Sequence, residues 1–327
     1  MKKKVLVLGG TGLLGYHTTL ELLANGYKVV SISLPPMPKD DLFEGMDVEN
    51  YLFDINEKTD EELLGYLDGV YGVMYAIGAD ERIVPDAPAF TFFYEQNVRT
   101  TQRMVRLARK KGVEKFVVYG SYFSEFAQRW PETNLIDHAY PKTRILQEDI
   151  AFAEGEGAVD VTVLRLPYIF GVIPGRMPLW KMFTDQIKGQ DVFPALPGGT
   201  TMVTVKQVAQ AARGAMEKGE HRKTYVLGWH NMKYKDFYEM MVEALGQKGK
   251  TQIPVVPLEA MLPAYQEYDR LAKENGKEHG IHMAKGAEMN CRDLYIDPKP
   301  VMDAIGYKED DVVAAIKETL KYIVENG

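Results

Sequence analysis

Short apolar runs alternate with longer amphipathic stretches over the first half of the chain. Runs rich in Val, Ile, Leu and Tyr predict buried strands at residues 4–8, 27–34, 51–55, 70–78, 116–121 and 160–165. Between these runs apolar side chains recur at helical spacing, as at Val98, Val105 and Ala108 in a predicted helix over 97–111. Strands and helices that alternate in this way form a parallel sheet with helices on both faces. The pattern therefore predicts a doubly wound α/β fold.

The second half of the chain is less regular. Residues 172–201 are rich in proline and glycine, which predicts a ligand-facing loop region with one helix near 180–187. Beyond it the periodicity predicts one more strand at 225–228 and helices over 207–217, 234–245, 259–279 and 310–324. We expect this part to be a smaller, mainly helical unit.

The predicted strand at 4–8 runs directly into a glycine-rich turn and a helix that ends at Asn25-Gly26. A pyrophosphate requires such a turn, because unpaired N–H groups at a helix N-terminus attract an anion and side chains would block its approach. A lone Gly-x-Gly-x-x-Gly is weak evidence, but the strand before it and the helix after it supply the confirming context. The stretch predicts a dinucleotide site formed by Gly9, Thr11, Gly12, Leu13, Leu14 and Gly15.

The sequence predicts two domains, one that binds the dinucleotide and one that binds the substrate. Residues 1–170 are expected to form a dinucleotide-binding Rossmann domain, to which residues 200–230 return. Residues 171–200 and 231–327 are expected to form the substrate-binding domain. The cofactor is expected to be NAD or NADP.

The end of the second predicted strand bears on the choice between NAD and NADP. An acidic residue at this position normally holds the adenosine ribose hydroxyls, but the chain has Ser33 there. Ser33, with Lys39 nearby, favours NADP slightly, because a hydroxyl and an ammonium group can donate hydrogen bonds to a 2′-phosphate. Asp54 ends the third predicted strand and either faces the adenine or caps a turn.

Composition and charge exclude several classes of protein. The 327 residues carry a net charge of −7, which disfavours nucleic acid as the main ligand, and the cationic helix 97–111 is better explained as a solvated face. No run of 18 apolar residues is present to span a membrane. The single cysteine, Cys291, favours a reducing compartment, so we expect a cytoplasmic protein. The histidines show no metal-binding arrangement, and no metal is expected.

The candidate chemistry lies at the end of the fifth predicted strand and the start of the next long helix. The strand delivers Ser121 at its carboxyl end, and Tyr140 and Arg144 lie one turn apart on the helix, where they can address one ligand. A unit charge about 5 Å from the phenol lowers a tyrosine pKa by about two units at an effective dielectric of 20. The three residues predict an acid–base site.

These motifs together resemble the extended short-chain dehydrogenase/reductase family, in its NAD-dependent epimerase/dehydratase branch. The matching segments, which span essentially the whole chain, are Gly9-x-x-Gly12-x-x-Gly15, Asp54-Ile55, Ala76-Ile77-Gly78, Asn97-Val98, Ser121, Tyr140 and Leu164-Arg165-x-Pro167-Tyr168-x-x-Gly171. The resemblance implies catalytic roles for Tyr140, Ser121 and Arg144, and commonly a homodimer, here through the helices that begin near residues 97 and 140. It also implies cofactor contacts, beyond the glycine-rich turn, from Ser33, Asp54, Ile55, Ala76, Ile77, Gly78, Asn97, Tyr119, Tyr140, Arg144, Pro167, Tyr168 and Ile169.

The chain departs from the family pattern at three positions. The family's Tyr-x-x-x-Lys is Tyr140-x-x-x-Arg144 here, and Ser33 replaces the acid after the second strand. Tyr122-Phe123 follow Ser121 where dehydratases carry an acidic pair, which disfavours elimination of water.

The resulting expectation is an NAD(P)-dependent oxidoreductase that acts on an alcohol or carbonyl carbon of a sugar, polyol or similar small substrate. Epimerisation through a transient ketone is its favoured form, and a simple NADPH-dependent ketoreductase is the alternative enzyme. A non-catalytic dinucleotide-binding sensor or scaffold is the alternative outside catalysis, because Arg144 cannot easily release a proton.

Overall fold

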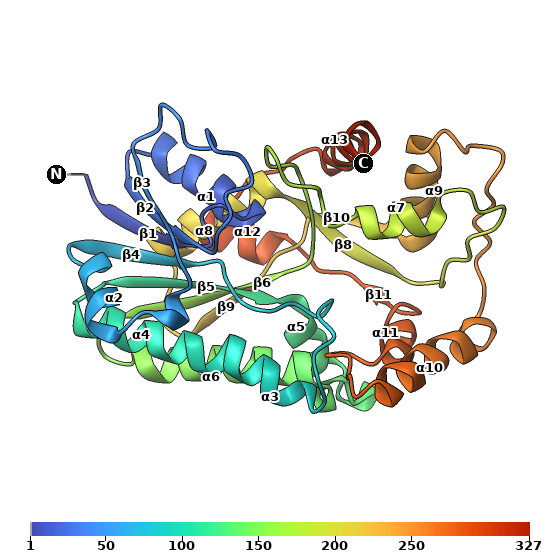
Figure 1. Cartoon of the computed structure of the whole chain (residues 1–327), viewed down its shortest axis with the longest axis horizontal. Coiled ribbons are helices and arrows are strands. Elements are labelled where there is room, and N and C mark those ends of the chain that lie inside the picture. Colours follow the sequence, from blue (N-terminus) through green and yellow to red (C-terminus); the bar gives the residue numbers. More distant parts are fainter. Residues whose placement is uncertain (1) are drawn as a thin grey trace.

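Seven parallel strands form the main sheet of the computed structural model, which describes residues 2–327 (Figure 1). In spatial order they are β3 (Val48–Leu52), β2 (Lys28–Ser33), β1 (Lys4–Leu8), β4 (Val70–Tyr75), β5 (Lys115–Ser121), β6 (Asp160–Leu166) and β9 (Lys223–Val226). The strand order reverses between β1 and β4, and a crevice opens at the carboxyl ends of parallel strands at such a point. The predicted doubly wound α/β fold is confirmed.

Helices cover both faces of this sheet (Figure 1). One face carries α1 (Leu13–Ala24), α8 (Val205–Lys218) and α12 (Lys299–Ile305), and the other carries α2 (Asp60–Tyr66), α4 (Thr100–Lys110) and α6 (Ala139–Gly155). Alternate residues of each strand point to opposite faces, so Phe116 and Val118 of β5 enter one core while Val117 and Tyr119 enter the other. All four are buried. The sheet is therefore apolar on both faces, as the uninterrupted apolar runs predicted.

A second, smaller sheet lies beside the carboxyl edge of the first. Its centre is β8 (Gly199–Thr204), which pairs with β10 (His230–Lys233) in antiparallel and with β7 (Tyr168–Phe170) and β11 (Asp293–Leu294) in parallel. The helices α7 (Lys181–Ile187), α9 (Tyr234–Ala244) and α13 (Val312–Asn326) pack near it around Phe170, Trp180 and Phe237. The C-terminal part is thus not helical alone, and the division into two domains stays a prediction.

The remaining helices surround the carboxyl edge of the main sheet. They are α3 (Ala89–Phe93), α5 (Tyr122–Arg129), α10 (Leu258–Glu274) and α11 (Met283–Met289). Helix α3 continues through a π-helical turn (Tyr94–Arg99) into α4. In the described residues 2–327, three short 3-10 turns lie at Ile55–Glu57, Pro131–Thr133 and Leu135–Asp137. Among residues 2–327, the helices are all too short or too polar to cross a lipid bilayer.

The third strand was placed wrongly by the sequence pattern. We expected it at residues 51–55, but β3 spans Val48–Leu52. Asp54 is the cap of the following 3-10 turn, because its Oδ1 accepts a hydrogen bond from the Asn56 N–H at 2.8 Å. A capping aspartate ends a strand and begins a turn, so the strand must stop before it.

A buried ion pair ties β6 to the helices on one face of the sheet. Arg165 is 4% exposed, and its guanidinium donates to Glu148 of α6 at 2.6 Å and to Glu125 of α5 at 2.9 Å. Burial raises the pKa of the Glu148 carboxyl, and the Arg165 charge opposes that rise. These ion pairs hold α5 and α6 against β6.

Removing one partner of this ion pair should destabilise the folded protein. Arg165→Met leaves Glu148 buried without its counter-ion, so we expect the free energy of unfolding to fall by about 3–5 kcal/mol. Arg213→Met is the control, because Arg213, whose side chain is 25% exposed, pairs with Glu21 and Glu217 at a partly exposed site, and the substitution should cost less than about 1 kcal/mol. Urea unfolding followed by circular dichroism measures both, and equal losses would contradict the assignment.

Candidate active site

The glycine-rich turn after β1 has the close contacts that only glycine permits. Gly9 has φ +86°, in the left-handed region, and a Cβ there would collide with the Ala76 carbonyl oxygen. A Cβ at Gly15 would collide with the Gly9 carbonyl group, so glycine lets α1 start directly against the turn. Gly10 packs in the same way against Ser31 of β2.

The N-terminus of α1 is open toward the crevice. Gly12 is the N-cap and forms no side-chain capping hydrogen bond, and a Cβ placed on it would meet only the Gly9 oxygen within 4 Å, at 3.2 Å. The N–H groups of Leu13, Leu14 and Gly15 belong to the first helical turn, which has no carbonyl partners within the helix. Open space over a capless helix N-terminus fits a pyrophosphate. The residues present therefore fit a dinucleotide.

The residues expected near the adenosine have other partners in the structure. The buried Ser33 Oγ accepts a hydrogen bond from the Thr11 N–H at 3.0 Å, which links β2 to the glycine-rich turn. Lys39 forms a 3.0 Å ion pair with Asp41. The Asp54 side chain caps a turn, and the Ile55 side chain is buried in the core, so these two residues can face a ligand mainly through their backbone.

The loop after β4 is held in place by Asn97. The Asn97 side chain is completely buried and binds both polar groups of the Ala79 backbone, accepting from its N–H at 2.8 Å and donating to its carbonyl at 3.0 Å. This amide clamps the segment Ala76-Ile77-Gly78, which lines the cleft. Asn97 thus positions the cleft wall rather than forming it.

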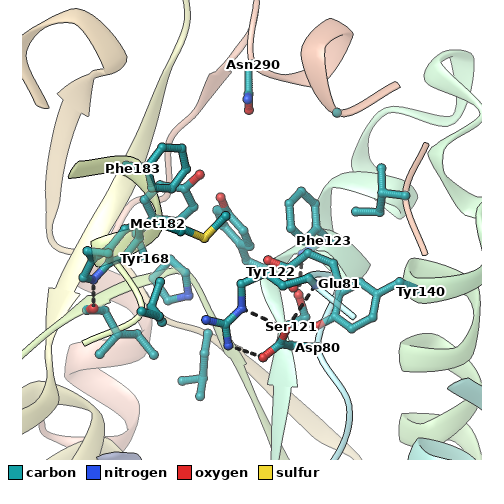
Figure 2. A pocket seen from close by; sticks show the side chains of 18 of the residues that line it. Asp80, Glu81, Ser121, Tyr122, Phe123, Tyr140, Tyr168, Met182, Phe183 and Asn290 are labelled. Carbon is teal, nitrogen blue, oxygen red and sulfur yellow. Dashed lines mark hydrogen bonds and ion pairs between the residues drawn. The ribbon is translucent and has the colours of Figure 1, made fainter. Parts of the chain in front are cut away.

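Tyr140, Ser121 and Arg144 meet at the floor of the cleft. Arg144 Nε donates to the Tyr140 hydroxyl at 3.2 Å, since the two residues lie one turn apart on α6 with Pro141 in its first turn. Ser121 ends β5, and its Oγ accepts from the Phe123 N–H at 3.2 Å as the cap of α5. Figure 2 shows Ser121 beside Tyr140. The serine and the phenol that the sequence assigned to acid–base chemistry are therefore neighbours.

Arg144 is buried and heads a chain of hydrogen bonds. It is 7% exposed, and its Nη1 donates to Gln147 Oε1 at 2.7 Å. Gln147 Nε2 donates to Thr101 Oγ1 at 2.8 Å, and Thr101 Oγ1 donates to the Asn97 carbonyl at 2.6 Å. The chain links α6, α4 and the Ala79 loop, so the guanidinium, the phenol and the cleft wall are positioned together.

The pKa of Tyr140 is raised above its ordinary value. Burial is the main cause, and the nearby Glu81 adds to it, while the Arg144 charge and Ser121 act in the opposite direction. The sequence had predicted a lowered pKa from the Arg144 charge alone. That prediction was wrong because removing the phenol from water, at 2% exposure, outweighs the charge beside it.

Two acidic side chains in the cleft were missed from the sequence. Asp80 and Glu81 follow β4 and lie next to Ser121 and Tyr140 (Figure 2). Asp80 accepts a hydrogen bond from Arg82 Nε at 2.9 Å, and burial together with the Asp80 charge raises the pKa of Glu81. Their loop has no hydrophobic period or motif, so only the fold reveals that they reach the site.

The cleft continues away from the sheet between the C-terminal elements. Its volume is about 640 Å³, and Pro167, Tyr168 and Ile169 are among the residues that line it. In Figure 2, Tyr168, Met182 and Phe183 lie on the side opposite Ser121 and Tyr140. Tyr119 also borders the cleft, but its hydroxyl is hydrogen-bonded to Thr18 of α1 at 2.7 Å, on the other side of the sheet from α6.

A C-terminal segment closes the cleft behind Tyr140. The Gly280 carbonyl accepts from the Tyr140 N–H at 2.8 Å, and Gly280 has no space for a side chain against Phe93 and Tyr140. The His282 N–H donates to Nδ1 of His138, the residue before α6, at 3.3 Å. Burial and the neighbouring His282 lower the pKa of His138 to about 4.

Comparison with known proteins agrees with this architecture. Residues 5–228 match the model of the NAD dependent epimerase/dehydratase family. The chain belongs to this family, as its motifs predicted, and is therefore an NAD(P)-dependent enzyme of the extended short-chain dehydrogenase/reductase type.

Individual relatives are distant in sequence but similar in structure. A putative dihydroflavonol 4-reductase of Synechocystis sp. is 21% identical over 98% of this chain and 94% of its own length. The crystal structure of a nucleoside-diphosphate-sugar epimerase from Pseudomonas aeruginosa superposes with a TM-score of 0.74 at 17% identity, covering 100% of this chain and 99% of that one. UDP-glucose 4-epimerase from Bifidobacterium longum, solved with NAD+ and UDP, gives 0.70 at 16% identity, covering 99% of each chain. At these identities the two structures support the fold.

The lowered pKa of His138 predicts how the stability of the protein depends on pH. Its lowered pKa means that the unfolded chain binds this proton more readily, so stability is fully present above about pH 6.5 and is lost as the pH falls toward 4. His138→Asn keeps an acceptor near the Nδ1 position without the titration, so the melting temperature should fall less between pH 6.5 and 4 than in the wild type. Calorimetry at a series of pH values measures this, and parallel curves for the two proteins would refute it.

Proposed function

We propose that the protein transfers hydride between a nicotinamide dinucleotide and an alcohol or carbonyl carbon of a small substrate. The observation that carries the proposal is the hydrogen-bonded Tyr140–Arg144 pair beside Ser121, next to a glycine-rich turn that fits a dinucleotide. The sequence favoured a sugar, polyol or similar substrate. The reacting end of the cleft requires only an oxygen that the Tyr140 and Ser121 hydroxyls can reach.

The roles of the three side chains follow from their chemistry. The bound dinucleotide supplies hydride to the carbonyl carbon or accepts it from the alcohol. In the reductive direction Tyr140 gives its phenolic proton to the carbonyl oxygen, and the Ser121 hydroxyl donates a hydrogen bond to the same oxygen. Arg144 remains protonated throughout and stabilises the phenolate that Tyr140 becomes.

Two forms of this reaction have to be separated. Epimerisation through a transient ketone, which the sequence favoured, consumes no cofactor, whereas net reduction oxidises one cofactor for each product molecule. Burial raises the pKa of Tyr140, so the phenol keeps the proton that the reductive half of either form needs. The Synechocystis relative, which is named as a putative reductase and matched over 98% of this chain, supports net reduction.

The cofactor that copurifies, identified by mass spectrometry, is the starting point for the test. A panel of alcohols and ketones is then incubated with that cofactor while its reduced form is followed by absorbance. Stoichiometric oxidation indicates reduction, and product formation at constant absorbance indicates epimerisation. Cofactor binding without turnover of any compound would favour the sensor or scaffold. The homodimer and the cytoplasmic location stay predictions.

If Tyr140 is the acid–base residue, Tyr140→Phe removes only a hydroxyl group. Turnover should fall by about 10²–10⁴-fold, the usual loss for a general acid, with cofactor affinity nearly unchanged. Tyr307→Phe is the matched control, since it also removes one buried hydroxyl, but Tyr307 donates to the Gly228 carbonyl and does not line the cleft. Equal losses in the two variants would show that the proton comes from elsewhere.

Arg144→Met tests the role of the cation through the pH dependence of turnover in the same assay. Without the cation, the phenolate is less favourable and the pKa of Tyr140 rises further, so the alkaline limb of the pH profile should move upward. A profile that does not move would separate Arg144 from the chemistry.

Cofactor choice depends on Ser33. Ser33→Asp places a carboxylate where the serine lies at the end of β2, and a carboxylate accepts hydrogen bonds from ribose hydroxyls and repels a 2′-phosphate. The Thr11 N–H would retain an acceptor. We expect the ratio of kcat/KM for NADH over NADPH to rise by at least about tenfold. Ser31→Asn on the same strand, at a position packed against Gly10, tests whether general disturbance of β2 gives the same shift.

A further inference from the structure

The side chains that line the cleft change from polar and charged to mainly aromatic and apolar with distance from the reacting groups. The part nearest the sheet contains hydroxyl, carboxylate and guanidinium groups, whereas the far part is lined by aromatic and apolar side chains from the C-terminal elements. These are Tyr168, Leu179, Trp180, Met182, Phe183, Phe193, Tyr234, Tyr238, Met261, Tyr265, Ile281 and Met283. A cleft of about 640 Å³ lies within the range of roughly 300–1,000 Å³ that holds a drug-sized ligand.

The aromatic rings of the far wall form a continuous surface. Tyr238 of α9 contacts Phe193 at 5.2 Å in an edge-to-face arrangement and Phe183 at 6.0 Å, measured between ring centroids. It also stacks at 6.4 Å on Tyr234. Phe183, Phe193 and Tyr238 are each half-buried, so part of every ring stays open to the cleft. Half-buried rings at the side of a cleft offer edges and faces for another aromatic ring.

The charged groups that line the cleft are occupied or belong to the reacting end. Arg82 is paired with Asp80, and Arg144 is bonded to Tyr140 and Gln147. His279 lies 3.2 Å from the Asp269 carboxylate. Among residues 2–327, the far wall contributes no arginine or lysine. A diphosphate placed there would lose its hydration without gaining a counter-charge, which costs several kilocalories per mole.

Polar groups of the far wall are neutral. The Tyr234 hydroxyl donates to Asn290 Oδ1 at 2.9 Å, and the Tyr122 hydroxyl is paired with Thr200 at 3.1 Å. Asn290 lies across the cleft from Ser121 (Figure 2). With its oxygen occupied, Asn290 keeps its amide N–H₂ to donate to a ligand.

We propose that the substrate is an uncharged aromatic or similarly apolar carbonyl compound or alcohol, and not a nucleotide sugar. Its reacting oxygen lies at Tyr140 and Ser121, its ring system lies against Phe183, Phe193 and Tyr238, and a distant oxygen accepts from Asn290. The substrate class rests on the proposed function only for the reacting carbon, since the ring-binding wall is independent of turnover.

Binding calorimetry with two inert probes tests the wall directly. The protein is saturated with the nicotinamide dinucleotide that it retains, so that neither probe can enter the cofactor site. It is then titrated with 2-naphthol, a neutral bicyclic aromatic alcohol, and with UDP. We expect 2-naphthol to bind at least about tenfold more tightly than UDP.

Substitutions in the aromatic far wall of the cleft test whether 2-naphthol binds there. Tyr238→Ala should weaken 2-naphthol about tenfold, because it removes one ring face and its buried area, and Phe193→Ala should act in the same direction. Tyr268→Ala is the matched control, since Tyr268 is 58% exposed on α10 and does not line the cleft, and it should change nothing.

Each outcome has a definite meaning. Tighter binding of UDP, or unchanged 2-naphthol affinity in both wall variants, overturns the proposal. Turnover of non-aromatic, polar compounds alone also overturns the substrate class. Wall-dependent 2-naphthol binding without turnover of any compound leaves the pocket assignment standing and refutes the proposed hydride transfer instead.

Discussion

A buried guanidinium is the constraint on which the site depends. Arg144 has been taken out of water at a cost of several kilocalories per mole, so its N–H groups need partners. Three of its five N–H groups have acceptors, which are the Tyr140 hydroxyl, Gln147 and, at 3.4 Å, the Tyr119 carbonyl. Satisfying one charge therefore fixes the phenol, the helix α6 and the end of β5 with respect to one another.

The same constraint extends to the cleft wall. Gln147 uses its oxygen for Arg144 and its nitrogen for Thr101, and Thr101 leads to Asn97, whose side chain clamps Ala79. Every member of this chain is buried, so none can exchange its partner for water. The Asp80 and Glu81 carboxylates come directly after the clamped residue, which explains how a loop without secondary structure presents acids to the site.

Parts of this site could be predicted from the sequence because the determinants are local. The glycine-rich turn needs positive φ and close approach within a few residues, and the Tyr140–Arg144 spacing of four follows from the helix itself. The small second sheet could not be predicted in this way. Its strands have two to six residues, and β8 pairs with partners about 30 to 90 residues away in sequence. The aromatic wall is likewise assembled from distant segments.

The structure also shows what an arginine provides at position 144, where the resemblance led us to expect a lysine. A lysine offers three N–H groups on a single nitrogen, whereas the planar guanidinium donates from two separate nitrogens, from Nε to Tyr140 and from Nη1 to Gln147. Gln147 therefore gives the guanidinium a second side-chain acceptor beside the phenol. Arg144 and Gln147 therefore act as one unit, which holds a positive charge beside the phenol.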